Sequence, residues 1–318
     1  MEQNMKGQEN RGVEKVLVFG RGAVGVALCQ PLADNLESEN FAFYADENRK
    51  ERYEKNGLIV NGTPVNFRYV SSLKEFGPAD LVLFFTKYKD LKEAMEQAAP
   101  FITDQTILMC GTNGICSEED LKACFPKNDV IRSIAQRMDA AYRDNEVRFT
   151  TPGELVFGAE RPDQKPDVRR VKDLFTRNGL PYRVSNQIVH DQWNKLMVNC
   201  GLNQICAGFD LTYGALAASP EHMALFHQAM QEVAAVAHAQ GIELSEEERK
   251  KWSDDLLTYA PDSMPSMRQD ILAGRPTEKV LFSGTVVPLG KKAGIDCPVL
   301  ALLYEKVEER ENEKAQSV

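Results

Sequence analysis

The sequence predicts an α/β protein, with a parallel sheet covered by helices on both faces in the first part of the chain and an all-helical second part. From about residue 15 to residue 186, short apolar runs alternate with helical stretches, as in consecutive strand–helix–strand units. The runs KVLVF (residues 15–19) and LVLFF (residues 81–85) lack apolar–polar alternation, which suits strands buried on both faces. After about Gln187 the apolar residues recur with a helical period.

Each element of this arrangement has its own signal in the sequence. Compact apolar runs predict strands at residues 15–19, 41–45, 81–85, 106–109, 130–135 and 153–157. The first two strands are followed by predicted helices over residues 24–36 and 46–55. In the second part, helices are predicted over residues 191–206, 220–240, 245–257, 278–293 and 298–311, and a loop with a short helical stretch over residues 262–277.

The change in character places a domain boundary near residue 186. The polar start of the chain predicts a disordered leader over residues 1–13. Residues 14–186 then form the predicted α/β domain, and residues 187–318 form the predicted helical domain.

Composition narrows the class of protein. The 318 residues are 43% hydrophobic and 27% charged, as in an ordinary globular protein. A net charge of -9 argues against nucleic acid or an anionic membrane as the main partner. No apolar run approaches the length that spans a membrane. The seven cysteines form no CxxC pair or zinc-type cluster, so we expect reduced thiols, a cytoplasmic protein and no metal site.

A glycine pattern lies between the first predicted strand and the first predicted helix. Gly20 permits a tight turn, Gly22 lets the backbone approach a pyrophosphate, and Gly25 allows the helix to pack closely on the strand. Amides at the start of the helix would face the phosphates. The alternative is a tight glycine turn without a ligand. The pattern favours a Rossmann-type domain whose dinucleotide contacts the turn Gly20, Arg21, Gly22, Ala23, Val24 and Gly25.

Residues after the second predicted strand bear on the choice of dinucleotide. Asp46 stands 21 positions after Gly25, where an acid binds the ribose hydroxyls of NAD. Arg49, Lys50 and Arg52 follow at once and could instead hold the 2′-phosphate of NADP. These residues could also be the solvated start of a helix. Both cofactors therefore stay open at this point.

A polar stripe lies on the first helix of the second part. Lys195, Asn199 and Asn203 are four positions apart, so a helix places them on one face. Most neighbouring residues are apolar, and unpaired buried polar groups cost roughly 1–3 kcal/mol each. The stripe is therefore expected to line a solvated cleft, unless it is merely the polar edge of a surface helix. A partly desolvated lysine has a lowered pKa and can donate a proton to the alkoxide that hydride reduction of a ketone creates.

Several further short segments occur one after another between about residues 14 and 300. They are Thr86-Lys87, Asn113-Gly114, the run WNKLMVNCGLN at residues 193–203, and the runs SMRQD and GRPTE at residues 266–270 and 274–278. Together with the glycine turn, these segments resemble the ketopantoate reductase (2-dehydropantoate 2-reductase) family.

The resemblance implies reduction of a small 2-oxo acid, 2-dehydropantoate, to (R)-pantoate, on the way to pantothenate and coenzyme A. NADP(H) is the cofactor it favours, with NAD(H) as the alternative. It implies that Lys195 is the general acid and that Glu278 holds the substrate, which makes these two the catalytic residues. Glu278 could also simply begin a helix with Thr277 as its N-cap. His190, which precedes the predicted helix that carries Lys195, is expected to be structural.

The resemblance also assigns binding residues. Asn113 contacts both the nicotinamide and the substrate, and Lys87 lies near the nicotinamide. Asn199 and Asn203 line the substrate cleft, and Ser266 contacts the carboxylate end of the substrate.

Four positions depart from the residues that are usual in the family. Val280 replaces an acid, Ser283 and Tyr213 replace asparagines, and Asp46 stands where an arginine often meets the 2′-phosphate of NADP. These changes leave the reaction type intact and open a second hypothesis, a related dehydrogenase for another branched or bulky 2-oxo acid. A third hypothesis is a dinucleotide-binding sensor that has lost catalysis. The helical domain could also pair two copies as a homodimer.

Overall fold

The chain folds into two compact units. The computed structural model describes residues 12–316. The first unit holds the described residues through Thr112 together with Ser117–Val189, and the second holds Asn113–Cys116 together with the described residues from His190 onward. The short segment Asn113–Cys116 therefore belongs to the second unit. The predicted single boundary near residue 186 did not include this exchange.

The predicted leader is described only at its end. Its residues 1–11 lie outside the described residues. Val13, which the prediction placed in the leader, is fully buried in the core of the first unit. The ordered domain thus includes this residue.

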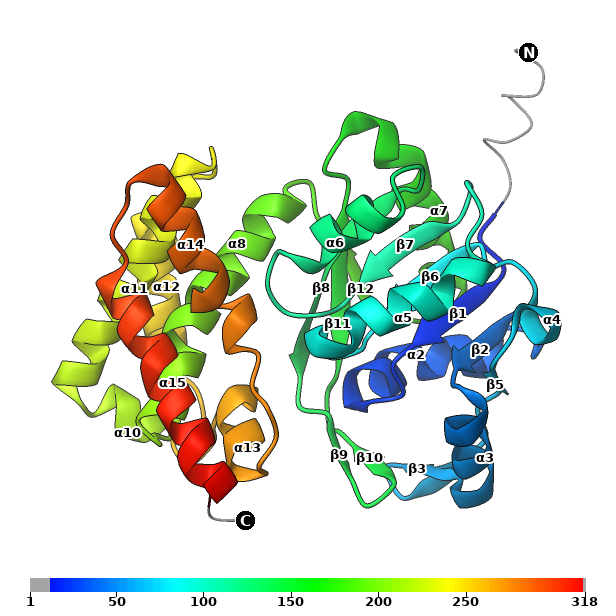
Figure 1. Ribbon diagram of the computed structural model, residues 1–318, viewed down its shortest axis with the longest axis horizontal. Helices are drawn as coiled ribbons and strands as arrows, with labels where there is room; N and C mark the ends of the chain where they lie inside the picture. The colour runs from blue at the N-terminus through cyan, green and yellow to red at the C-terminus, as the bar shows by residue number, and fades with distance from the viewer. Residues whose placement is uncertain (1–11, 317–318) are drawn as a thin grey trace. The chain divides into compact units, whose positions relative to one another are not determined.

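An eight-stranded sheet forms the centre of the first unit (Figure 1). Its order is β12 (Tyr182–Val184), β11 (Pro152–Gly158), β8 (Val130–Met138), β7 (Ile107–Cys110), β6 (Leu81–Phe84), β1 (Val16–Phe19), β2 (Phe41–Tyr44) and β5 (Tyr69–Val70). All neighbours run parallel except β8 and β11, which are antiparallel. The prediction of a parallel sheet is correct apart from this pair.

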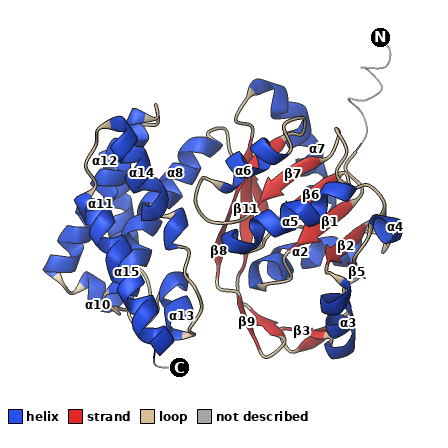
Figure 2. Ribbon diagram, viewed as in Figure 1, coloured by secondary structure: helices blue, strands red, loops and turns tan. Residues whose placement is uncertain are grey.

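Helices cover both faces of the sheet, as predicted (Figure 2). Val16 and Val18 of β1 belong to one buried cluster, together with residues of α2 (Ala23–Asn35) and α7 (Lys165–Asn178). The alternate residues of β1 belong to the opposite cluster, together with residues of α5 (Leu91–Ala98) and α6 (Ser117–Cys124). Because successive side chains of a strand point to opposite faces, β1 is buried on both sides.

A second, small sheet in the first unit was not predicted. Its order is β4 (Thr63–Val65), β3 (Leu58–Val60), β10 (Glu146–Arg148) and β9 (Ala141–Arg143). Strands of three residues carry too little sequence periodicity to be recognised. This sheet joins the chain after α3 (Glu47–Asn56) to the hairpin that follows β8.

The described part of the second unit contains helices and no strand. They are α8 (Ile188–Val198, beginning in the first unit), a π-helical turn η4 (Asn199–Asn203), α9 (Gln204–Gly208), α10 (Tyr213–Ala217), α11 (Pro220–Ala239), α12 (Glu246–Leu256), α13 (Ser266–Leu272), the 3₁₀ turn η5 (Lys279–Leu281), α14 (Ser283–Ala293) and α15 (Pro298–Gln316). The predicted helix over residues 278–293 is interrupted at Phe282. None of the described helices is long and apolar enough to cross a membrane.

Candidate active site

An amide links the predicted general acid to the predicted substrate-binding carboxylate. Lys195 on α8 donates from Nζ to Asn113 Oδ1 at 2.9 Å. Asn113 in turn donates from Nδ2 to Glu278 Oε2 at 2.9 Å. Both contacts lie within the second unit, because the segment containing Asn113 belongs to it. The structure therefore brings three predicted site residues from distant parts of the sequence into one chain of hydrogen bonds.

Burial controls the protonation of the lysine. Desolvation lowers the pKa of Lys195 to about 8, and the negative charge of Glu278 opposes part of this effect. A group with a pKa near 8 is still mostly protonated at neutral pH and gives up its proton far more readily than an exposed lysine. The arrangement can therefore deliver a proton to an oxygen atom beside Lys195.

The helix that carries the polar stripe is not regular. Residues Asn199–Asn203 form a π-helical turn, a rare feature that is frequent at functional sites. Within this turn the backbone has π-helical rather than α-helical hydrogen bonding. Asn203 donates from Nδ2 to Asn199 Oδ1 at 3.2 Å, so the two predicted substrate-binding amides contact each other.

A hydrogen-bond network fastens α8 to α12. Asn194, next to the candidate acid, donates to Glu248 Oε1 at 2.8 Å and accepts from Trp252 Nε1 at 2.6 Å. His190 lies inside α8 rather than before it, and its Nε2 is 3.2 Å from the same Glu248 oxygen. These contacts support the structural role expected for His190.

The segment around Glu278 is held by α15. Thr277 donates its backbone N–H to Glu311 Oε1 at 2.6 Å, and Lys279 Nζ donates to Glu311 Oε2 at 2.6 Å. Glu278 stands just before η5 rather than within the first turn of a longer helix, which corrects that alternative interpretation. Ser266, the first residue of α13, is exposed to solvent.

The residues that depart from the family pattern have distinct surroundings. Val280 is an exposed apolar residue, with 45% of its surface accessible. Ser283 is fully buried and donates to Gln204 Oε1 at 2.5 Å. Tyr213 lies against the ring of Tyr259, with 5.1 Å between ring centroids.

The glycine turn in the first unit is tightly packed at two of its three glycines and open at the third. Gly20 has a φ of 108°, and a Cβ there would lie 2.5 Å from the carbonyl carbon of Phe85. A Cβ on Gly25 would lie 2.1 Å from Gly20 O, whereas a Cβ on Gly22 would meet nothing within 4 Å. Gly22 is the N-cap of α2 and offers no side-chain cap to the helix amides. Beside the turn, the buried Thr86 Oγ1 has no hydrogen-bond partner among the described residues.

These features fit an anionic cofactor. The open space over Gly22 leaves room for a pyrophosphate. A pyrophosphate could also accept hydrogen bonds from the uncapped helix amides and from the unpaired hydroxyl of Thr86. The side chain of Arg21 is an exception among the predicted cofactor contacts. Its guanidinium is buried and bonded to Tyr69 and Gly57 within the unit, so only its backbone is presented by the turn.

Asp46 and Arg49, two of the residues expected to determine the cofactor preference, contact each other. Asp46 is the N-cap of α3, accepting from the Arg49 backbone N–H at 2.8 Å, and its carboxylate also pairs with the Arg49 side chain. The backbone and side-chain hydrogen bonds from Arg49 lower the pKa of Asp46. Lys50 pairs with Glu75 at 2.5 Å, and Lys87 is exposed just before the 3₁₀ turn η1 (Tyr88–Asp90). This geometry supports a helix-capping role for Asp46. It does not distinguish NAD(H) from NADP(H) as the cofactor.

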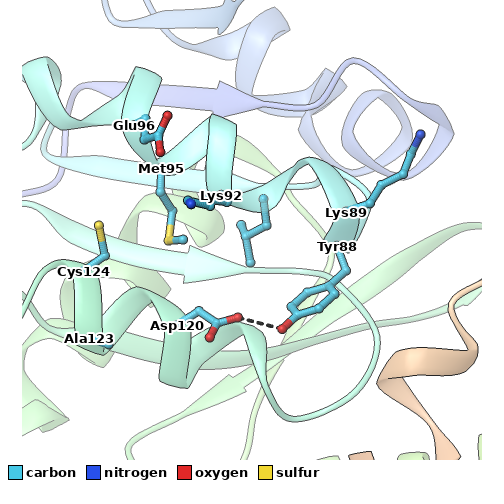
Figure 3. A pocket seen from close by; sticks show the side chains of 9 residues that line it. Tyr88, Lys89, Lys92, Met95, Glu96, Asp120, Ala123 and Cys124 are labelled. Atoms are coloured by element: carbon cyan, nitrogen blue, oxygen red, sulfur yellow. Dashed lines mark hydrogen bonds between the residues drawn. The ribbon is translucent and has the colours of Figure 1, made fainter. Parts of the chain in front are cut away.

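A pocket of about 630 Å³ lies elsewhere in the first unit (Figure 3). Tyr88 donates to Asp120 Oδ2 at 2.9 Å at one side of it. The pocket is lined by Tyr88, Lys89, Leu91, Lys92, Met95, Glu96, Asp120, Ala123 and Cys124. None of these is a predicted site residue.

Comparisons with known proteins agree with the resemblance found in the sequence. The chain is 26% identical over 302 residues to a 2-dehydropantoate 2-reductase of Streptococcus pyogenes, covering 93% of this chain and 97% of that protein. It is 27% identical over 309 residues to a 2-dehydropantoate 2-reductase of Aquifex aeolicus, covering 94% and 97%.

Solved structures show the same fold. A PanE/ApbA family ketopantoate reductase from Ralstonia eutropha JMP134 matches with a TM-score of 0.81 at 24% identity, over 95% of this chain and 99% of that one. A D-mandelate dehydrogenase matches with a TM-score of 0.84 at 22% identity, over the same shares. At such identities these two structures bear on the fold alone.

Family models cover most of the chain. The model described as "Ketopantoate reductase PanE/ApbA" matches residues 16–162, and the model described as "Ketopantoate reductase PanE/ApbA C terminal" matches residues 187–311. The chain therefore belongs to the ketopantoate reductase family of oxidoreductases.

Proposed function

We propose that the protein reduces 2-dehydropantoate to (R)-pantoate with a nicotinamide dinucleotide, a step toward pantothenate and coenzyme A, and that NADP(H) is the preferred cofactor. The observation that carries the proposal is the chain from Lys195 through Asn113 to Glu278, which joins a proton donor to a carboxylate. The 2-dehydropantoate 2-reductase names of the relatives support the substrate.

When bound, a reduced nicotinamide would supply the hydride that the carbonyl carbon of the substrate accepts. As the carbonyl π bond breaks, its electron pair moves to oxygen, and Lys195 transfers a proton from Nζ to that oxygen. The product is an alcohol, and the neutral amine of Lys195 regains a proton from solvent. The positive charge of Lys195 also stabilises the negative charge that develops on oxygen before the proton arrives.

The other residues orient these groups. Asn113 accepts from the ammonium with its oxygen and donates to Glu278 with its nitrogen, so its amide is fixed in one orientation. Glu278 has a second carboxylate oxygen that can accept a hydrogen bond from a substrate hydroxyl. We assign Asn199 and Asn203 on the π-helical turn, and Ser266 at the start of α13, to binding the rest of the substrate.

A panel of 2-oxo acids offered with NADPH and with NADH tests the proposal. The near-ultraviolet absorbance of the reduced cofactor reports turnover directly. We expect 2-dehydropantoate to give the highest kcat/KM in the panel. A higher kcat/KM for a different acid would assign another substrate, and cofactor binding without turnover of any acid would favour the sensor.

The second candidate is a dehydrogenase for a different branched or bulky 2-oxo acid. The exposed Val280 and the aromatic Tyr213, at positions where the family usually has polar residues, favour this candidate. A D-mandelate dehydrogenase of the same fold was solved with NADH and anilino(oxo)acetate. An aromatic 2-oxo acid therefore belongs in the substrate panel, with NADH as one of the cofactors.

The cofactor preference can be tested at the start of α3. Asp46→Ala is expected to lower kcat/KM for NADH relative to NADPH by about tenfold, because a charged hydrogen bond to the ribose would be lost. Arg49→Ala is expected to move the ratio in the opposite direction, because a cation near the 2′-phosphate would be lost. Steady-state kinetics with both cofactors measure the ratio. If neither variant changes it, both residues lose this role.

The pH dependence of kcat follows from the pKa of Lys195. Its folded value of about 8 lies below the ordinary value for lysine, and only the protonated form donates. We expect kcat to be constant below about pH 7 and to fall about tenfold per pH unit above pH 8 to 9. A pH–kcat profile measures this fall, and a profile that stays flat up to pH 10 would contradict the assignment.

We further propose that the protein is cytoplasmic and forms a homodimer. All seven cysteines are free thiols, as is usual in a reducing compartment. A ketopantoate reductase from Staphylococcus aureus with the same fold is described as dimeric. Light scattering at several protein concentrations tests the oligomeric state.

A further inference from the structure

The second residue of the glycine turn carries a buried cation. Only 8% of the surface of Arg21 is accessible. Its Nε donates to Tyr69 OH at 2.7 Å, and its Nη2 donates to the carbonyl oxygen of Gly57 at 2.7 Å. A longer contact of 3.4 Å joins Nη1 to Tyr142 OH. All these partners lie in the first unit, so the side chain ties the turn to its surroundings.

The partners of this cation are neutral. Its guanidinium carbon lies 4.2 Å from the ring centroid of Tyr53 and 5.5 Å from that of Tyr69. Burial raises the pKa of Tyr69, against the opposing effect of Arg21, so the phenol stays protonated at neutral pH. Within residues 12–316, no carboxylate forms an ion pair with Arg21.

Another buried arginine of the same unit is paired differently. Arg132 is 6% accessible and contacts the carboxylates of both Glu119 and Glu160. A buried charge without a counter-charge is costly to the fold, and buried charges are normally paired. Arg21 is thus a buried cation whose counter-charge is not supplied by the described part of the protein.

We propose that Arg21 is a positioning residue for the pyrophosphate of the dinucleotide, with its fixed charge attracting the anion and its hydrogen bonds holding the turn in the binding shape. The guanidinium points into the domain and acts through the turn rather than by touching the ligand. The open space over Gly22 and the helix amides beside it are where the anion would bind. This inference rests on the dinucleotide binding of the proposed function.

The test compares a ligand that carries the pyrophosphate with one that lacks it. Binding of ADP, NADH and adenosine is measured by isothermal titration calorimetry on wild type and on Arg21→Gln. We expect the Kd of ADP and of NADH to rise about tenfold, and the Kd of adenosine to change less than about twofold, since the lost charge acts on the phosphates. Arg21→Lys, which keeps the charge, should recover part of the ADP affinity. The salt dependence of ADP binding should be weaker in Arg21→Gln than in wild type.

Arg68 provides a matched control. Its guanidinium also contacts neutral groups, donating to Ser38 O at 3.0 Å and Glu75 O at 2.7 Å, and it lies 5.6 Å from the Phe76 ring centroid. Arg68 precedes β5 at the amino ends of the parallel strands, whereas the glycine turn follows the carboxyl end of β1. Arg68→Gln should leave the Kd of ADP unchanged.

The outcomes separate this inference from the proposed function. If wild type binds neither ADP nor a dinucleotide, the proposed function fails. If wild type binds ADP and Arg21→Gln binds it equally well, the role of Arg21 is overturned. Equal weakening of ADP and adenosine, with a lower Tm and no change in salt dependence, would also overturn it, since the arginine would then only support the fold.

Discussion

Lys195→Met is expected to lower kcat by about 10²- to 10⁴-fold, the range typical for loss of a general acid. Met keeps the length and apolar stem of lysine and cannot donate a proton to the alkoxide oxygen. The Kd of the dinucleotide, measured by titration of cofactor fluorescence, should change less than about twofold, because the turn that fits the phosphates lies in the first unit. The pH dependence of kcat above pH 8 should disappear with the lysine.

A loss of folding stability should not account for the lower kcat of Lys195→Met. Burial lowers the pKa of Lys195, which means that the fold disfavours its charged form. Replacing the lysine with an apolar side chain removes that penalty, so Tm should stay level or rise. Lys250→Met on α12, where an exposed lysine pairs with Asp254 at 2.6 Å, is the control and should keep wild-type kcat. Near-normal kcat in Lys195→Met would require another proton donor.

The architecture of the first unit could be predicted because its central strands are rich in apolar residues. β1, β2, β6 and β7 coincide with continuous apolar runs, and β8 and β11 coincide with runs that polar residues interrupt. The antiparallel pairing of β8 with β11 could not be predicted, since strand direction depends on the path of the intervening chain rather than on local pattern. The three-residue strands of the small sheet are stabilised by pairing partners that are distant in sequence, such as β3 with β10.

In the candidate site, too, features set by local sequence could be predicted, whereas features set by contacts between distant residues could not. The apolar periodicity around Lys195 predicted a buried helix, and α8 with η4 and α9 spans it. The π-helical turn within it has no signal in the residue pattern. Asn113 could be chosen only from the resemblance, and its contact with Glu278 depends on a segment that leaves one unit for the other. The motif placed Arg21 at the cofactor, whereas the direction of its side chain depends on acceptors at Gly57 and Tyr69.

Gly25→Ala is expected to raise the Kd of the dinucleotide by about 100-fold or more and to lower the free energy of unfolding by about 1–3 kcal/mol, as overpacking does. The added Cβ would lie 2.1 Å from Gly20 O and 3.3 Å from Phe85 Cβ, distances at which the backbone of the turn must move. Because the turn and the start of α2 move together, the amides that face the phosphates are displaced. Titration of cofactor fluorescence and thermal denaturation measure the two effects.

Gly22→Ala separates packing from ligand contact. Its Cβ would meet no protein atom within 4 Å, and its φ of -87° suits alanine, so Tm should stay level or rise slightly. If the pyrophosphate approaches the backbone at Gly22, the methyl group occupies its space, and the Kd should rise without any loss of stability. A variant that binds the dinucleotide as tightly as wild type would mean that the phosphates lie elsewhere. The pair of variants thus distinguishes a turn shaped for the anion from one shaped only by the packing of α2 on β1.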